Sequence, residues 1–336
     1  MKCYCKTNQE NFHKVLKENA ESKGEEICFD FYDYSGTERK NHTLTRRELF
    51  GKSCKIANLL KNEGAKKGDK VVIFSTQTAD NVLSSIASIF TGTVFTIIPP
   101  PIDASKMMRF LSVLESCKPK FILCTLELKI KLKDVLKKLQ KDEKYRSFIE
   151  ELKIVTVEES VNHSDELAPE TILLDDIIYL QYSSGSTSAP KGVEITYGNL
   201  ISNLNLCLES YEIKRIFAWV PFFHNIGLVY LMFAPVIKTD LCAGIMSPAA
   251  FLERPARWIE GLSEFKADVT VAPNSAFESY PKLVPPKTLK NIDLSNLKSA
   301  HAGAEIVTYS ALKKFTEAYE HLGFNIEKFV TGYGLA

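Results

Sequence analysis

The chain has 336 residues, which is enough to bury a sizeable core, so we expect one large or two α/β domains. With 42 basic and 41 acidic residues the charges nearly cancel, which leaves no overall electrostatic footprint for nucleic acid or an anionic membrane. Hydrophobic residues make up 45% and charged residues 25% of the chain, values that are ordinary for a soluble globular protein and exclude a disordered one.

The N-terminus gives no sign of export. Met1 to Cys5 lack an apolar signal region, and apolar runs such as Gly227 to Ile237 are too short to span a bilayer. We therefore predict a cytoplasmic protein without an integral membrane segment, whose ligand lies in a pocket. The eight cysteines lack zinc or disulfide spacing and are read as small buried hydrophobic residues, although a metal-binding pair at Cys3 and Cys5 stays open.

Local patterns in the first half of the chain alternate between strand and helix, which is typical of a parallel sheet. A strand is predicted at residues 29–34, and Thr45 followed by Glu48 predicts a capping box for a helix that reaches Asn62. The other elements predicted here are strands at 70–74, 93–98, 121–124 and 154–157 and helices at 79–90, 105–116 and 128–141.

The helix predicted at residues 128–141 is rich in lysine. Charge on one face of a helix usually serves only to keep that face solvated, and we interpret the lysines in this way. A binding patch is the alternative.

A polar, acidic stretch from Asn162 to Thr171 contains Pro169 and is typical of a linker. We therefore predict a first α/β subdomain over residues 1–169 and a second over residues 170–336. The elements predicted in the second are strands at 177–182, 216–220, 241–246, 269–271, 297–301 and 328–331 and a helix at 199–210.

A run of small hydroxyl residues and glycine, from Tyr182 to Gly192, directly follows one of these strands. The backbone N–H groups and hydroxyls of such a loop can point at a polyphosphate, and Lys191 adds positive charge, so the segment suits ATP. The spacing is not that of a Walker A loop, because Pro190 precedes the lysine and Gly192 follows it. A flexible surface turn is the alternative, which the embedded Pro-Lys-Gly disfavours.

The segment from Ser183 to Gly192 resembles the phosphate loop of adenylate-forming enzymes, a superfamily that includes acyl-CoA synthetases, luciferases and nonribosomal adenylation domains. Ser188 stands where the family usually has glycine. Residues 219–228 resemble the motif whose aromatic–histidine pair lies beside the carboxylate and the α-phosphate, with Asn225 in place of the usual aspartate. By this similarity, His224 donates hydrogen bonds to the developing anion.

Two later segments are also similar to superfamily motifs. Residues 299–305 resemble the strand end whose backbone lies against adenine, where a close approach favours Gly-Ala. Residues 331–336 resemble the motif in which a tyrosine stacks on adenine and the next glutamate binds Mg²⁺, and the chain ends at Ala336, one residue before that glutamate.

Residues 97–101, 247–258 and 272–278 are similar in sequence and in order to segments of fatty acyl-AMP ligases. This resemblance covers almost the whole chain. It implies an α/β fold with two packed βαβα subdomains of the N-terminal domain of an adenylate-forming enzyme. It also implies that the chain is truncated before the third subdomain and the C-terminal lid domain.

The resemblance implies that a fatty acid carboxylate reacts with ATP to give acyl-adenylate and pyrophosphate, with Mg²⁺ as the second cofactor. An acyl carrier protein is the candidate acceptor, and no nucleic acid is expected as a partner. The implied catalytic residues are His224 and Lys191. The implied nucleotide-binding residues are Ser183, Ser184, Gly185, Ser186, Thr187, Lys191, Gly303, Ala304, Glu305, Tyr333 and Gly334.

A noncatalytic, truncated or remnant protein that binds nucleotide or an acyl chain is the alternative. The chain lacks the expected Mg²⁺ glutamate, the ribose-binding aspartate and the C-terminal domain with its catalytic lysine. On that basis we expect weak ATP binding and little or no adenylate formation by the 336-residue chain alone. Residues 228–237 and the region around Trp258 and Phe277 are candidates for an apolar acyl tunnel.

Overall fold

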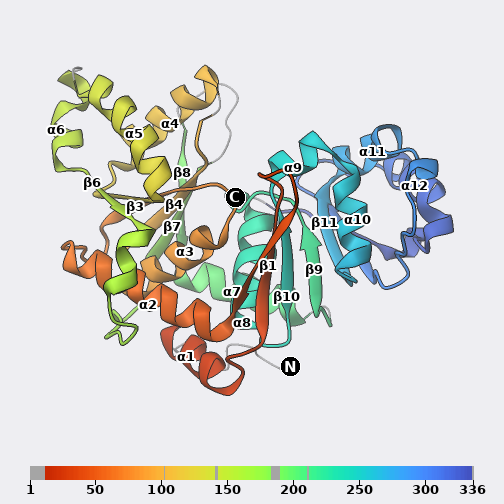
Figure 1. Ribbon diagram of the computed structural model, residues 1–336, viewed down its shortest axis with the longest axis horizontal. Coiled ribbons are helices and arrows are strands. Elements are labelled where there is room, and N and C mark those ends of the chain that lie inside the picture. The colour runs from red at the N-terminus through yellow and green to blue at the C-terminus, as the bar shows by residue number, and fades with distance from the viewer. Residues whose placement is uncertain (1–11, 102, 141–142, 183–189, 210–211, 335–336) are drawn as a thin grey trace. The chain divides into compact units, whose positions relative to one another are not determined.

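The protein is described by a computed structural model that covers residues 12–101, 103–140, 143–182, 190–209 and 212–334 (Figure 1). The chain divides into two compact units, each with its own sheet. Unit 1 comprises residues 1–26 and 45–206, and unit 2 comprises residues 27–44 and 207–336.

Unit 1 contains a six-stranded sheet with the strand order β6-β5-β3-β4-β7-β8. The pairs are parallel except for β7 and β8, which are antiparallel. The strands are β3 (Lys70–Phe74), β4 (Val94–Ile98), β5 (Phe121–Cys124), β6 (Lys153–Thr156), β7 (Ile177–Tyr182) and β8 (Gly192–Thr196). The helices are α1 (Phe12–Ser22), α2 (Arg46–Asn62), α3 (Ala79–Thr91), α4 (Ala104–Cys117), α5 (Leu126–Leu139), α6 (Glu143–Glu151), the 3₁₀ turn η1 (Val157–Asn162) and α7 (Tyr197–Glu209), whose last residues belong to unit 2.

Helices α4 and α5 cover one face of the unit 1 sheet, and Figure 1 shows them close to each other. Phe110 and Leu114 of α4 and Leu132 of α5 pack in one cluster with Val72 and Ile122 of the strands. Strand β4 is buried along its whole length, as expected for a central strand of a parallel sheet.

The predicted capping box at the start of α2 is confirmed. The Glu48 backbone N–H donates to the Thr45 hydroxyl at 3.2 Å, and the Thr45 N–H donates to the Glu48 carboxylate at 3.0 Å. The two bonds satisfy backbone donors that would otherwise have no partner, so α2 begins at Arg46.

Unit 2 contains a seven-stranded sheet with the strand order β13-β12-β11-β9-β10-β1-β2. The strands are β1 (Ile27–Asp33), β2 (Lys40–Thr45), β9 (Arg215–Ala218), β10 (Cys242–Met246), β11 (Val269–Pro273), β12 (Ser299–Gly303) and β13 (Phe329–Thr331). The helical segments are the π-helix η2 (Gly227–Phe233), α8 (Ala234–Ile237), α9 (Pro248–Glu253), α10 (Ala256–Glu264), α11 (Asn274–Leu283), α12 (Tyr309–Tyr319) and the 3₁₀ turns η3 (Pro286–Thr288), η4 (Glu320–Leu322) and η5 (Ile326–Lys328).

The core of unit 2 is largely aromatic. Trp258 is fully buried and lies edge-on to Tyr280, with ring centroids 5.1 Å apart. Its indole N–H donates to the Thr270 hydroxyl at 3.0 Å, and that hydroxyl donates to the Phe217 carbonyl at 2.8 Å. The core therefore satisfies the polar atoms of the buried tryptophan and threonine while burying large apolar rings.

The α/β class and the parallel-rich sheets agree with the prediction from sequence, and strand β3 has the predicted bounds. The predicted division at residue 169 differs from the division in the structure. Residues 170–206 belong to unit 1, because β7 pairs with β4, whereas β1 belongs to unit 2, because it pairs with β10.

Within the described residues, none of the helices combines the length and the apolar character needed to cross a membrane. Cys54 and Cys124 are buried, as predicted, whereas Cys207 and Cys242 are only partly buried. Cys3 and Cys5 lie outside the described residues.

Candidate nucleotide and acyl site

The predicted phosphate loop lies mainly outside the described residues, which include none of Ser183, Ser184, Gly185, Ser186 and Thr187. Its flanks are described. Tyr182 in β7 and Gly192 in β8 are partners in the antiparallel ladder, so the residues that border the loop lie next to each other. The Tyr182 carbonyl accepts a hydrogen bond from Arg109 at 3.4 Å, and its hydroxyl donates to Ser116 at 3.1 Å. Lys191 is exposed and precedes β8 directly.

The segment with His224 forms a tight turn that leads into the π-helix. The His224 N–H donates to the Pro221 carbonyl at 3.1 Å, and the Leu228 N–H donates to the His224 carbonyl at 2.8 Å. The imidazole is exposed and lies 4.9 Å from the Phe223 ring between ring centroids. A π-helix is rare and often marks a functional site, which makes this turn a candidate for ligand contact.

The carboxyl ends of β11, β12 and β13 meet at one edge of the unit 2 sheet. The register pairs Pro273 with Gly303 and Ala302 with Thr331, and the Gly332 N–H donates to the Ala302 carbonyl at 3.0 Å. Since open parallel sheets bind ligands beyond the carboxyl ends of their strands, this edge is a candidate site.

Gly303 lies where three of the predicted motifs meet. A Cβ atom at this position would lie 2.9 Å from the Gly332 carbonyl oxygen and 3.7 Å from the Ile226 side chain. The first distance is shorter than real Cβ contacts, so the backbone of the third motif approaches closely only because residue 303 is glycine. The next residue, Ala304, has a φ of 65°, in the left-handed region.

The side chains that follow β12 and β13 differ in their contacts. The Glu305 carboxylate accepts a hydrogen bond from the Ser275 backbone N–H at the start of α11. Tyr333 is 90% exposed, so its ring has a face that a planar ligand can stack on. The predicted site residues His224, Gly303, Ala304, Glu305, Tyr333 and Gly334 all belong to unit 2, where Gly303 lies close to Gly332 and Ile226. Lys191 belongs to unit 1.

Two residues within these motifs were given no role in the sequence analysis. Burial lowers the pKa of His301 to about 4, so this imidazole is neutral at physiological pH. It lies 3.1 Å from the Ser299 hydroxyl and 5.6 Å from the Tyr230 ring on the π-helix. The buried Trp219 indole nitrogen has no hydrogen-bond partner among the described residues, and its ring stacks on Phe251 at 3.8 Å. A polar residue inside a predicted strand is the one signal that marked His301.

A metal site is not apparent in the part of the chain that the structure describes. No group of three or more His, Cys, Asp or Glu side chains there is arranged to hold a metal ion. We therefore assign no residues to Mg²⁺ and derive no step through it.

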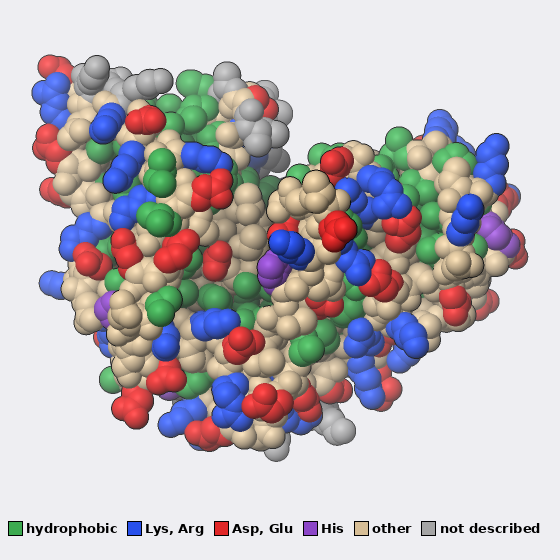
Figure 2. Space-filling model, in the orientation of Figure 1, with side chains coloured by type: hydrophobic (Ala, Val, Ile, Leu, Met, Phe, Trp, Pro, Cys, Tyr) green, Lys and Arg blue, Asp and Glu red, His purple; other side chains and the backbone are tan. Residues whose placement is uncertain are grey.

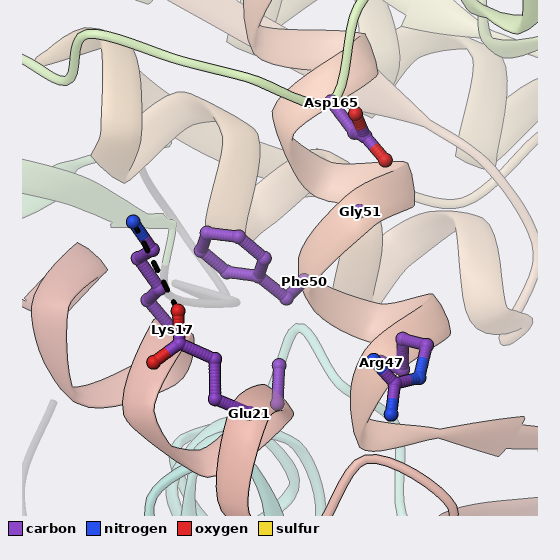
Figure 3. A pocket seen from close by; sticks show the side chains of 7 residues that line it. Lys17, Glu21, Arg47, Phe50, Gly51 and Asp165 are labelled. Carbon is purple, nitrogen blue, oxygen red and sulfur yellow. Dashed lines mark ion pairs between the residues drawn. The ribbon is translucent and has the colours of Figure 1, made fainter.

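A separate pocket of about 240 Å³ lies in unit 1 between α1, α2 and the segment that carries Asp165 (Figure 3). Figure 3 shows Phe50 at its centre, with Lys17 and Glu21 on one helix and Arg47 on another. Lys17 and Glu21 form an ion pair at 4.0 Å. The pocket contains none of the predicted site residues.

Solved structures with a similar fold include fatty acyl-AMP ligases. The crystal structure of a fatty acid AMP ligase from Legionella pneumophila matches with a TM-score of 0.88 and 27% sequence identity over 100% of this chain and 56% of that chain. A fatty acyl-adenylate ligase from L. pneumophila, in complex with acyl adenylate and pyrophosphate, matches with a TM-score of 0.86 and 27% identity over 99% of this chain and 56% of that chain.

The relatives found by sequence comparison are also fatty acid ligases. The long-chain-fatty-acid–AMP ligase FadD32 of Mycolicibacterium smegmatis is 31% identical over 332 residues, which are 94% of this chain and 50% of the relative. A medium-chain-fatty-acid–[acyl-carrier-protein] ligase, JamA of Moorena producens, is 30% identical over 306 residues, 89% of this chain and 50% of the relative. The chain thus spans about half the length of these curated relatives. The family model for AMP-binding enzymes matches residues 16–336, and the chain therefore belongs to this family.

Proposed function

We propose that the protein activates a fatty acid by forming a fatty acyl-adenylate from ATP. The observation that carries this proposal is the meeting of three motif segments at Gly303. A glycine that keeps two backbone segments close, with an exposed tyrosine one residue after Gly332, suits a planar ring bound against the strand ends.

The reaction requires an attack by the carboxylate oxygen of the fatty acid on the α-phosphorus of ATP. A new carboxylate O–P bond forms, the bond between the α-phosphorus and the bridging oxygen breaks, and pyrophosphate leaves with that electron pair. The protein's task is to hold the reactants in line and to stabilise the negative charge on the α-phosphate. Mg²⁺, when bound with ATP, supplies further charge neutralisation.

The residue roles follow from charge and position. Lys191, at the border of the phosphate loop, holds the β- and γ-phosphates together with Ser184 and Thr187 of that loop. The exposed His224 imidazole donates a hydrogen bond to the reacting carboxylate or the α-phosphate. Tyr333 stacks on adenine.

The remaining predicted contacts are of two kinds. The backbone after β12 frames the adenine, and the small residues of the phosphate loop bind phosphate oxygens through hydroxyl and N–H groups. The residues in these roles are Ser183, Gly185, Ser186, Gly303, Ala304, Glu305 and Gly334.

The acyl acceptor is proposed to be the thiol of an acyl carrier protein. Support comes from the relative from Moorena producens, which is named for transfer to such a carrier. The thiol would attack the carbonyl carbon of the adenylate, so that AMP leaves with the oxygen that came from the carboxylate.

We expect the full-length protein to release pyrophosphate in a reaction that depends on ATP and on a medium- or long-chain fatty acid. Lys191→Ala and His224→Ala should each lower the rate about ten- to a hundredfold, because each removes a charge-assisted hydrogen bond worth about 1.5–3 kcal/mol. A pyrophosphate-release assay with a panel of fatty acids measures both effects.

Matched controls are Lys313→Ala on α12 and His321→Ala in η4, which remove an exposed lysine and an exposed histidine outside the predicted site. Both controls should keep the wild-type rate. Release that does not depend on fatty acid, or equal rates for site and control variants, would contradict the proposal.

A further inference from the structure

Helix α5 carries two large apolar side chains on its solvent face. Leu126 is 53% exposed and Ile130 is 61% exposed, one helical turn apart. The opposite side of the helix is buried through Leu128, Leu132 and Leu136. The exposed pair is therefore not needed to attach the helix to the sheet.

Lysines share this solvent face. At 3.6 residues per turn, Lys133 and Lys137 lie on the same side of the helix as Leu126 and Ile130, and we name these four residues the α5 face. Both lysines are exposed, and neither forms an ion pair with another described side chain. By contrast, Lys131 on the flank pairs with Glu127 at 2.5 Å.

The excess of positive charge is local. Helix α5 contains five lysines and two carboxylates, whereas the whole chain has a net charge of only +1. Figure 2 shows Lys and Arg side chains mixed with Asp, Glu and isolated hydrophobic ones over the part of the surface where Figure 1 places α5. Helix α4 packs in the same cluster as α5 and also carries an exposed apolar side chain, Met108, which is 65% exposed.

We infer that the α5 face binds the surface of a membrane that contains anionic phospholipid. Long apolar side chains between lysines match the interface of such a membrane, where the apolar groups enter the acyl boundary and the ammonium groups meet lipid phosphates. An acidic protein is the competing occupant, and it would predict no binding to either kind of vesicle in the test below. The lysines that looked like a solvated face in the sequence are thus assigned to a lipid surface, independently of the proposed function.

The expected binding is weak and depends on salt. A lysine near an anionic bilayer contributes about a fivefold change in partitioning, and this contribution is screened within a Debye length. The two lysines of the α5 face therefore raise the partition coefficient about 25-fold together, and burial of the Ile130 side chain raises it roughly tenfold more.

The test is co-sedimentation of the full-length protein with vesicles of phosphatidylcholine alone and of phosphatidylcholine with phosphatidylglycerol. We expect binding to the anionic vesicles that weakens as salt rises, and little binding to the neutral ones. The double substitution Lys133→Glu with Lys137→Glu should lower partitioning about 25-fold or more, and Ile130→Asn about tenfold. These positions are exposed, so the fold should be kept, which circular dichroism checks.

The matched control is Lys313→Glu with Lys314→Glu on α12, an equal charge change at two exposed lysines, which should leave binding unchanged. Equal binding of the control and the α5-face variants would overturn the inference, as would binding that Ile130→Asn leaves unchanged. If the α5 face instead joins copies of this chain, the protein should self-associate in the absence of vesicles, and Ile130→Asn should abolish this self-association. That result, together with no vesicle binding, would also overturn the inference.

Discussion

Replacing Gly227 with alanine is expected to destabilise unit 2 by about 3 kcal/mol or more. A Cβ atom at this position would lie 2.0 Å from the Pro221 carbonyl oxygen and 2.6 Å from its carbonyl carbon. Both atoms belong to the backbone of the turn before the π-helix, so no side chain can move aside to make room. The turn that holds His224 would have to shift, because the His224 N–H donates to the Pro221 carbonyl.

The measurement is urea unfolding followed by tryptophan fluorescence. The chain has two tryptophans, Trp219 and Trp258, and both lie in unit 2, so the signal reports that unit. Gly332→Ala is the control, since a Cβ atom there would meet nothing within 4 Å. Gly332→Ala should change the urea midpoint of unfolding little. If Gly227→Ala gave the same midpoint as this control, the predicted clash with the Pro221 backbone would be absent.

Trp258→Ala should cost unit 2 about 3–5 kcal/mol, the range for removing a large aromatic side chain from a packed core. The side chain is fully buried and has ring contacts with Phe251, Phe277 and Tyr280. Its removal also takes away the donor that bonds to the Thr270 hydroxyl. Lost burial, a cavity and a lost hydrogen bond therefore act in the same direction.

Thermal and urea unfolding followed by circular dichroism measure this loss, with Trp219 fluorescence as a second probe. Trp258→Phe should recover part of the stability, because it refills much of the cavity. Leu252→Ala is the surface control, because Leu252 is 75% exposed and should change stability by less than about 0.5 kcal/mol. If Trp258→Ala cost no more than Leu252→Ala, Trp258 would not anchor the core as described.

Local patterns predicted most of the strands and helices because their signals are contained in a few neighbouring residues. The apolar run Lys70–Phe74 forms β3 with the predicted bounds, and Thr45 and Glu48 form the predicted cap. The π-helix at Gly227–Phe233 was not predicted, because the apolar run has no periodic signal that separates it from other buried helices.

The division into units could not be predicted from such signals. Strand β1 lies early in the chain but pairs with β10, more than two hundred residues later, through the register of Phe29 with Ala243. The polar segment around Pro169 looked like a boundary, yet the Glu170 N–H donates to the Phe90 carbonyl inside unit 1. Pairings between distant segments decide the units, and no local pattern records them.

The candidate site shows the same limit. The motif residues were recognised one segment at a time, and their resemblance implied a role for each. The close approach of the Gly332 carbonyl oxygen to Gly303 depends on the register of β12 and β13, which the sequence does not display. The buried Trp219 nitrogen likewise emerges only from packing.

The most direct test of the central claim follows oxygen from the fatty acid into the nucleotide. The full-length protein is incubated with ATP, Mg²⁺, an acyl carrier protein with its thiol, and a fatty acid labelled with heavy oxygen in its carboxylate, and the products are analysed by mass spectrometry. Acyl-adenylate formation requires the carboxylate oxygen to bond to the α-phosphorus, so we predict labelled AMP after acyl transfer and an equal amount of pyrophosphate. Label in inorganic phosphate with release of ADP, or unlabelled AMP, would contradict the account.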